Sequence, residues 1–390
     1  MVSVFEGRPT SIMVYLLIIL GVLAIGIILF INLHPTFGGS PSKQDRERNR
    51  YFDHYKNNQF VNQSPTDMKM DLSTILSLLK DSLTGKKDRS PNNPIPISLD
   101  WNKINSVEDS LTWFGHSTML LTLDKKKILI DPMFGPSPSP VSFIGTKRYS
   151  EDLLYVIEKL PQIDVVLITH DHYDHLDYPS IIKVKDKVGH FIVPLGVAAH
   201  LIRWGINEDR ITECNWWDEK QWDGLTIASV PSQHFSGRGL FNRNSTLWNG
   251  WVILGENLRI YTSGDGGYGP HFKQIGEKYG PFDLTLMEGG QYDKRWSAIH
   301  MQPEESVQAH LDVKGKNMML IHWGAFTLAY HSWTDPVDRA IRAAKQKEVK
   351  LIAPNIGETV VLNGRFPEPN SWWKALSTKN SLEIESSTSQ

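Results

Sequence analysis

The stretch that most constrains the fold is an apolar strand followed at once by a histidine-rich turn. The run from Asp164 to Ile168 has the composition of a strand that is buried on both faces. The next residues, 170–175, contain three histidines and two aspartates. Asp177 then precedes Pro179, a combination typical of a helix start. The sequence therefore predicts a strand, a polar turn and a helix in immediate succession.

The residue types in this turn predict a metal site. His170 and His172, two residues apart at the end of a strand, can converge on one ion, while Asp174 and His175 can hold a second. Imidazole nitrogen and carboxylate oxygen suit zinc, with bonds of about 2.0–2.2 Å. Cys214 is the single cysteine, which argues against a thiolate zinc site and rules out an intrachain disulfide.

Further ligands are expected where other strands end. His234, Asp265 and His322 each come directly after an expected strand. The glycines around Asp265 let the backbone turn sharply beside a metal. A single histidine at a strand end is more often structural. In combination with the first turn, however, these three residues predict one shared centre.

The N-terminal segment, residues 1–34, is predicted to contain a membrane anchor. Ile12–Leu33 is apolar and uncharged, and it is long enough to cross a bilayer core that needs about 20 residues. It fits a cleaved secretory signal less well, because such signals have a shorter apolar region and a small-residue cleavage site. Several basic residues follow it, and the positive-inside rule then places the main body on the cytoplasmic side. These residues are Lys43, Arg46, Arg48 and Arg50.

The rest of the chain divides into three predicted regions. Residues 35–98 are expected to be a polar tether with one amphipathic helix, Asp67–Leu83, that packs on the main domain. Short β-like runs then alternate with helical segments, which predicts a layered α/β hydrolase domain over residues 99–366. Residues 367–390 are polar and are expected to form a loose tail. The formal net charge of −2 gives no overall basic field, so we predict no nucleic-acid partner.

With these motifs in view, the chain resembles the metallo-β-lactamase superfamily, whose signature His-x-His-x-Asp-His is matched by residues 170–175. It resembles still more closely the N-acylphosphatidylethanolamine-hydrolysing phospholipases D and their bacterial relatives, over roughly residues 51–362. The matching motifs are Trp-Phe-Gly-His-Ser-Thr at 113–118, Ile-Asp-Pro at 130–132, Gln-His-Phe-Ser at 233–236, Leu-Trp-Asn-Gly at 247–250, Gly-Asp-Gly-Gly-Tyr at 264–268, Gly-Pro-Phe-Asp at 280–283 and Ile-His-Trp-Gly at 321–324. The chain departs from the group at Gly266, where threonine is frequent, and in the run from Glu288 to Gln291.

The resemblance implies an αββα sandwich with two Zn²⁺ ions at one edge. It implies that each ion has three ligands of its own and that one aspartate bridges the pair. The implied ligands are His170, His172 and His234 for the first ion, Asp174, His175 and His322 for the second, and Asp265 as the bridge. The implied catalytic residues are Asp174, Asp265 and His300, and the implied substrate contacts are Tyr173, His300 and His331.

These features predict a membrane-anchored, zinc-dependent phosphodiesterase. It would hydrolyse N-acylphosphatidylethanolamine-like membrane phospholipids to phosphatidic acid and N-acylethanolamine, using a hydroxide that bridges the metals. A lactonase or other ester hydrolase on the same centre is the alternative, and a non-catalytic interaction protein is the alternative from another class. The resemblance also implies a homodimer. Arg238 is expected to form a surface salt bridge or to meet phosphate, and His116 is expected to support the ligands or the core. Asp131 is expected either to orient a ligand histidine or to hydrogen-bond the turn at Pro132.

Overall fold

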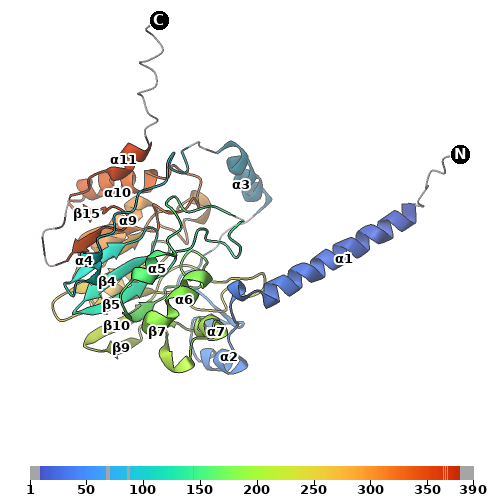
Figure 1. The fold of residues 1–390 in the computed structure, drawn as a ribbon, viewed down its shortest axis with the longest axis horizontal. Coiled ribbons are helices and arrows are strands. Elements are labelled where there is room, and N and C mark those ends of the chain that lie inside the picture. Colours follow the sequence, from blue (N-terminus) through green and yellow to red (C-terminus); the bar gives the residue numbers. More distant parts are fainter. Residues whose placement is uncertain are drawn as a thin grey trace, which may run out of the picture.

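The computed structural model describes residues 9–377 except 67–70, 86–87, 144, 363, 365 and 367. Its body contains two seven-stranded sheets, and a long N-terminal helix stands away from that body (Figure 1). The first eight residues and those beyond 377, which belong to the predicted N-terminal segment and tail, lie outside the described residues.

The first sheet carries the strand that precedes the histidine-rich turn. In spatial order its strands are β16 (Thr359–Val361), β3 (Ser110–Trp113), β4 (Met119–Leu123), β5 (Lys126–Ile130), β6 (Ile163–Leu167), β7 (Val188–Pro194) and β8 (Ile211–Cys214). Strands β5 to β8 are parallel, and the β4–β5 hairpin turns through Asp124 and Lys125. Both turn residues have positive φ, 48° and 67°, as a two-residue hairpin of this hand requires.

The second sheet supplies the other strand ends. In spatial order its strands are β15 (Lys350–Ile352), β14 (Gly315–Ile321), β13 (Phe282–Glu288), β12 (Arg259–Thr262), β11 (Gly250–Leu254), β10 (Leu225–Val230) and β9 (Glu219–Trp222). Strands β12 to β15 are parallel and β9 to β12 are antiparallel. Each sheet is therefore mixed.

Alternating side chains divide the first sheet between two hydrophobic layers. Leu121 and Val165 face the second sheet and join the larger core, whereas Leu120 and Val166 face outward into a second core. The outer core is covered by α5 (Val156–Lys159), α6 (Tyr178–Val184) and α7 (Ala198–Arg203). On the second sheet lie α8 (His271–Lys278), α9 (Pro303–Asp312) and α10 (Asp335–Gln346). This is the predicted order of helix, sheet, sheet and helix layers.

The region predicted as a polar tether instead packs on the domain. Helix α1 (Pro9–Leu33) leads directly into a single 3₁₀ turn, η1 (Pro35–Phe37), and Thr36 in that turn is buried. Asn49 and Phe60, further along the same segment, are also buried. The remaining short elements here are α2 (Lys43–Asn49), β1 (Tyr55–Lys56) and β2 (Gln59–Phe60). The tether prediction is wrong because isolated aromatic and polar residues, without any periodic pattern, anchor this segment.

The amphipathic helix is shorter than expected and presents its apolar face to solvent. It forms as α3 (Leu72–Thr84), capped by Asp71, while residues 67–70 lie outside the described part of the chain. None of its residues is buried, and Leu72 and Leu83 are among its exposed apolar side chains. Its polar side is the one held by the domain, because Arg295 contacts Asp81. The helix therefore contacts the domain, as predicted, but through its polar side.

The beginning of the predicted tail is folded. Helix α11 (Trp372–Ser377) places Trp373 in the larger core, and the indole Nε1 donates to Asp338 Oδ1 at 3.0 Å. The described residues also include α4 (Trp101–Asn105) and the 3₁₀ turns η2 (Lys185–Lys187), η3 (Glu208–Arg210) and η4 (Lys294–Trp296).

Candidate metal centre

The predicted ligands lie at the carboxyl ends of strands from both sheets. The histidine-rich turn follows β6, His234 follows β10, Asp265 follows β12 and His322 follows β14. Five strands of this region have a parallel neighbour: β5, β6, β12, β13 and β14. Ligand sites form beyond the carboxyl ends of such strands. The turn itself is set by α6, which begins at Tyr178 with the Asp177 side chain accepting from Ser180 N, as predicted.

The first group consists of three imidazoles. His170 Nε2 lies 2.8 Å from His172 Nδ1, and His234 Nε2 lies 3.2 Å from that same nitrogen. Two nitrogens bound to one tetrahedral zinc would be about 3.3 Å apart, given bonds of about 2.0–2.1 Å. The three ring nitrogens therefore already surround a space of the size that one ion needs.

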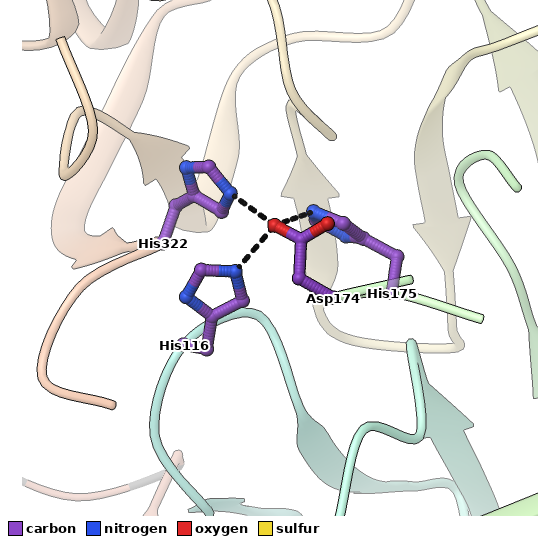
Figure 2. A group of neighbouring side chains, drawn as sticks. All are labelled: His116, Asp174, His175 and His322. Carbon is purple, nitrogen blue, oxygen red and sulfur yellow. Dashed lines mark hydrogen bonds and ion pairs between the residues drawn. The ribbon is translucent and has the colours of Figure 1, made fainter. Parts of the chain in front are cut away.

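The second group gathers around one oxygen of Asp174 (Figure 2). Asp174 Oδ2 lies 3.2 Å from His322 Nε2 and 3.5 Å from His175 Nε2, and a third ring, that of His116, approaches it to 2.9 Å. Figure 2 shows all three rings pointing at this oxygen. The prediction treated His116 as support for the core or the ligands, and the structure places it within this group.

Asp265 lies between the two groups. Its Oδ2 is 3.0 Å from His322 Nε2 and 3.1 Å from His175 Nε2, and it is 3.9 Å from both His170 Nε2 and His234 Nε2. Its other oxygen, Oδ1, is buried and has no hydrogen-bond partner among the described residues. A buried carboxylate oxygen without a partner is costly, and a bound cation would remove that cost. The geometry fits a bridging role.

Burial and charge prepare the two groups differently. Burial, together with the charge of His175, holds the pKa of His170 well below its usual value, so the ring is neutral and ready to bind metal. Burial would raise the pKa of Asp174, but the charge of His175 and the hydrogen bond from His116 hold it well below the usual range. Burial by itself would lower the pKa of His322, but the nearby carboxylates of Asp265 and Asp174 raise it to about 9. Without a metal, the second group therefore holds protons that a cation would displace.

Neighbouring groups fix the orientation of the ligands. Asp131 Oδ2 lies 2.8 Å from His175 Nδ1 and accepts from Thr169 Oγ1 at 2.7 Å. His234 Nδ1 lies 3.0 Å from the carbonyl oxygen of Ile299. Metal-binding histidines commonly donate their second nitrogen to such carboxylates and carbonyls. Of the two roles predicted for Asp131, the structure shows the one that orients a ligand histidine, His175.

The predicted substrate contacts are only partly at the centre. The ring of His300 lies 5.0 Å from that of His234 and 5.2 Å from that of His322, so His300 borders both groups. His331 stacks on Tyr292 at 4.2 Å and belongs to none of the metal-binding groups found among the described residues. The hydroxyl of Tyr173 donates to the carbonyl of Arg238, so it is already engaged.

Arg238 corrects one expectation. It forms neither a surface salt bridge nor an open phosphate contact, because the residue is only 2% exposed. Its guanidinium donates instead to the carbonyls of Asp171 and Leu176, both at 2.7 Å, and to that of Thr36 at 2.8 and 3.0 Å. It therefore ties the histidine-rich turn to the segment that follows α1.

Glu288 is a site residue that the sequence reasoning missed. It is the last residue of β13 and fully buried, with its carboxylate beside His300 and His322. The signal available was its position. An acidic residue follows Leu286 and Met287 at the end of β13, which lies between the ligand-bearing strands β12 and β14. Asn62 was missed as well: its side chain bonds both the backbone N–H of His234, at 3.1 Å, and the carbonyl of that residue, at 2.7 Å.

A family model described as a beta-lactamase superfamily domain matches residues 126–323, which include all seven predicted ligands. The chain belongs to the beta-lactamase superfamily. An uncharacterized protein of Mycobacterium tuberculosis is 39% identical over 360 residues, covering 90% of this chain and 96% of its own. A protein of Caenorhabditis elegans named N-acyl-phosphatidylethanolamine-hydrolyzing phospholipase D 1 is 38% identical over 264 residues, covering 63% of this chain and 74% of its own.

The superfamily assignment agrees with the fold. A metallo hydrolase of the archaeon Ignicoccus hospitalis has a solved structure that superposes with a TM-score of 0.52 at 24% identity, covering 65% of this chain and 97% of the other. That likeness shows the fold alone. Together with the family match and the clustered His and Asp side chains, it identifies the chain as a metal-dependent hydrolase of the beta-lactamase superfamily.

Proposed function

We propose that the chain is a membrane-anchored, zinc-dependent phosphodiesterase that hydrolyses N-acylphosphatidylethanolamine-like phospholipids to phosphatidic acid and N-acylethanolamine. The observation that carries the proposal is Asp265, whose Oδ2 lies within 3.9 Å of ligand nitrogens from both groups. A carboxylate in that position supports two ions held close together, with His170, His172 and His234 on one and Asp174, His175 and His322 on the other. The related nematode protein named for this activity supports the choice of substrate.

Two zinc ions, when bound, would polarise a phosphoryl oxygen, acidify a water molecule and stabilise the leaving oxygen. The protein supplies the acid–base groups. Either Asp174 or Asp265, whose carboxylates lie among the proposed ligands, would accept a proton from the attacking water. His300, with a side chain 13% exposed, lies at the rim of the centre and is placed to contact the phosphate and donate a proton to the leaving group.

The anchor fits a lipid substrate. Among the residues that the structure describes, one helical segment is long and apolar enough to cross a membrane, Met13–Leu33, and that span is not buried against the domain. Its end is held firmly, because Arg203 donates to the carbonyls of Asn32 and Leu33 and Trp204 donates to that of Pro35. We propose that α1 spans the bilayer with the domain on the cytoplasmic side. This arrangement would hold the centre at the membrane surface and raise the effective concentration of lipid.

The test is a product analysis. The full chain is loaded with two equivalents of zinc in mixed micelles and given N-acylphosphatidylethanolamine, phosphatidylcholine or an acyl lactone. Phosphatidic acid together with N-acylethanolamine is the expected result, whereas hydrolysis confined to the lactone would overturn the phosphodiesterase proposal in favour of the ester-hydrolase alternative. Asp265→Asn should abolish turnover, whereas Asp283→Asn should not, because Asp283 pairs with Lys316 away from the centre.

The expected homodimer remains a prediction. Sedimentation of the detergent-solubilised full chain checks it, and a monomer at micromolar concentration would contradict it.

A further inference from the structure

Glu288 has one carboxylate oxygen fixed and one directed at two imidazoles. Its Oε1 accepts the backbone N–H of Met301 at 2.7 Å. Its Oε2 lies 3.5 Å from Nδ1 of His300 and 3.7 Å from Nδ1 of His322. The residue has no solvent-accessible surface, so water cannot solvate the charge. Only these two rings face the free oxygen within hydrogen-bond or ion-pair range among the described residues.

The three atoms lack any other partner. Glu288 Oε2, His300 Nδ1 and His322 Nδ1 are all buried and make no hydrogen bond within the described part of the chain. Buried polar atoms are rarely left unpaired, because each costs about 1–3 kcal/mol. Here they face one another just beyond hydrogen-bond length. The two rings are also stacked, 5.2 Å apart at an angle of 12°, so that both direct the same edge toward the carboxylate.

His322 is the ligand for which this contact matters most. Among the other proposed ligands, His175 pairs through Nδ1 with Asp131 and His234 pairs with the carbonyl of Ile299. Within the described ranges, Glu288 is the one acidic residue on the Nδ1 side of His322. Its Nε2 meanwhile faces Asp174 and Asp265. The Glu288 carboxylate therefore faces Nδ1 of His322, as the Asp131 carboxylate faces Nδ1 of His175.

We propose that Glu288 is a positioning residue shared by a metal ligand and the substrate-facing histidine. By accepting from Nδ1 of His322 it aims Nε2 at the second metal, and by accepting from Nδ1 of His300 it aims the opposite ring nitrogen at the substrate. One carboxylate thus sets the orientation of both rings. The part concerning His300 rests on the proposed function, whereas the part concerning His322 rests only on the metal centre.

The first experiment measures metal binding, not turnover. Full-chain protein in detergent is titrated with Co²⁺ and Zn²⁺ by absorption and calorimetry, and its metal content is counted. Glu288→Gln keeps the shape of the side chain and the oxygen that accepts from Met301. The amide NH2 group then faces the two rings, and it cannot accept a hydrogen bond from them. We expect affinity at the second site to fall 10–100-fold, the usual effect of removing such a partner, and affinity at the first site to stay unchanged. Glu213→Gln is the matched control, because Glu213 is a half-buried carboxylate paired with Arg48 outside the centre.

A double-mutant cycle separates positioning from a general structural role. If Glu288 acts through His322, Glu288→Gln added to His322→Ala should weaken second-site binding no further. A parallel cycle with His300→Ala uses kcat for bis(p-nitrophenyl) phosphate at saturating zinc, and the double variant should match His300→Ala alone. Failure of this probe to react in wild-type protein would count against the proposed phosphodiesterase, while the metal titration would still decide the His322 part.

Two results would overturn the inference. One is a Glu288→Gln protein that is folded and binds both metals with wild-type affinity. The other is a loss of affinity that is equal at both sites, or fully additive with His322→Ala, since a merely structural role predicts either pattern. Partial recovery of second-site affinity in Glu288→Asp, which keeps an acceptor on a shorter side chain, would support it.

Discussion

Replacing Arg238 by methionine should loosen the junction between the segment that follows α1 and the histidine-rich turn. The guanidinium makes four hydrogen bonds to three backbone carbonyls, those of Thr36, Asp171 and Leu176. Each bond from a charged donor contributes about 1.5–3 kcal/mol, so the gross loss is about 6 kcal/mol or more. Burial lowers the pKa of Arg238, which reflects a desolvation cost that the variant no longer carries. We therefore expect a net loss of about 3–5 kcal/mol in the free energy of unfolding, because three buried backbone carbonyls lose this donor at about 1–3 kcal/mol each.

Two measurements on the full chain in micelles check this. Urea denaturation gives the free energy, and amide hydrogen exchange should show lost protection at residues 34–38 and 171–176 but not in β12 to β14. The matched control is Arg243→Met in the same loop, where the residue is exposed and its guanidinium, 4.2 Å from the centre of the Phe235 ring, should contribute about 1 kcal/mol or less. An Arg238→Met protein within 1 kcal/mol of wild type, with unchanged exchange at residues 34–38, would refute the reasoning.

Three further predictions follow from the same structure. Asp131→Asn should weaken metal binding through His175 by about 10–100-fold in a calorimetric titration, and unchanged affinity would show that the carboxylate serves only the turn. Because the pKa of His322 lies at about 9 without metal, the metal affinity of the second site should rise between pH 7 and 9, and metal binding should release protons. Calorimetric titrations in two buffers of different ionisation enthalpy measure the proton release, and a pH-independent affinity would contradict this prediction. Burial lowers the pKa of His271 from 6.5 to about 4, so the unfolded chain takes up the proton first and stability should fall by about 2 kcal/mol between pH 7 and 5. His271→Phe should flatten that part of the urea-measured pH profile, and an unaltered profile would exclude His271 as its source.

The strands and most of the centre follow from local patterns. A continuous apolar run such as Asp164–Ile168 has few ways to be buried except as an inner strand, and the polar residues after it must then lie at the sheet edge. The hairpin at Asp124 and Lys125 was predictable for a similar reason, since a polar pair between two alternating segments favours a tight turn. Geometry of this kind placed His175 and His322 near each other, with ring centroids 5.2 Å apart, although the two residues are far apart in the chain.

What could not be predicted depends on contacts without a repeating pattern. Thr36, Asn49 and Phe60 are buried singly, and no periodicity distinguishes them from residues of a solvated tether. For α3, the amphipathic pattern predicts an apolar face but not which side the domain holds, and that is decided by the ion pair between Arg295 and Asp81. Arg238 looked like a surface residue for a related reason, because its partners are backbone carbonyls, which leave no mark in the sequence.

The central claim is that seven side chains from distant strand ends hold two metal ions with Asp265 between them. Anomalous diffraction at the zinc absorption edge, from crystals of the zinc-loaded full chain, tests it most directly. We predict two peaks per chain, one among His170, His172 and His234 and the other among Asp174, His175 and His322. A single peak, or peaks away from these residues, would contradict it.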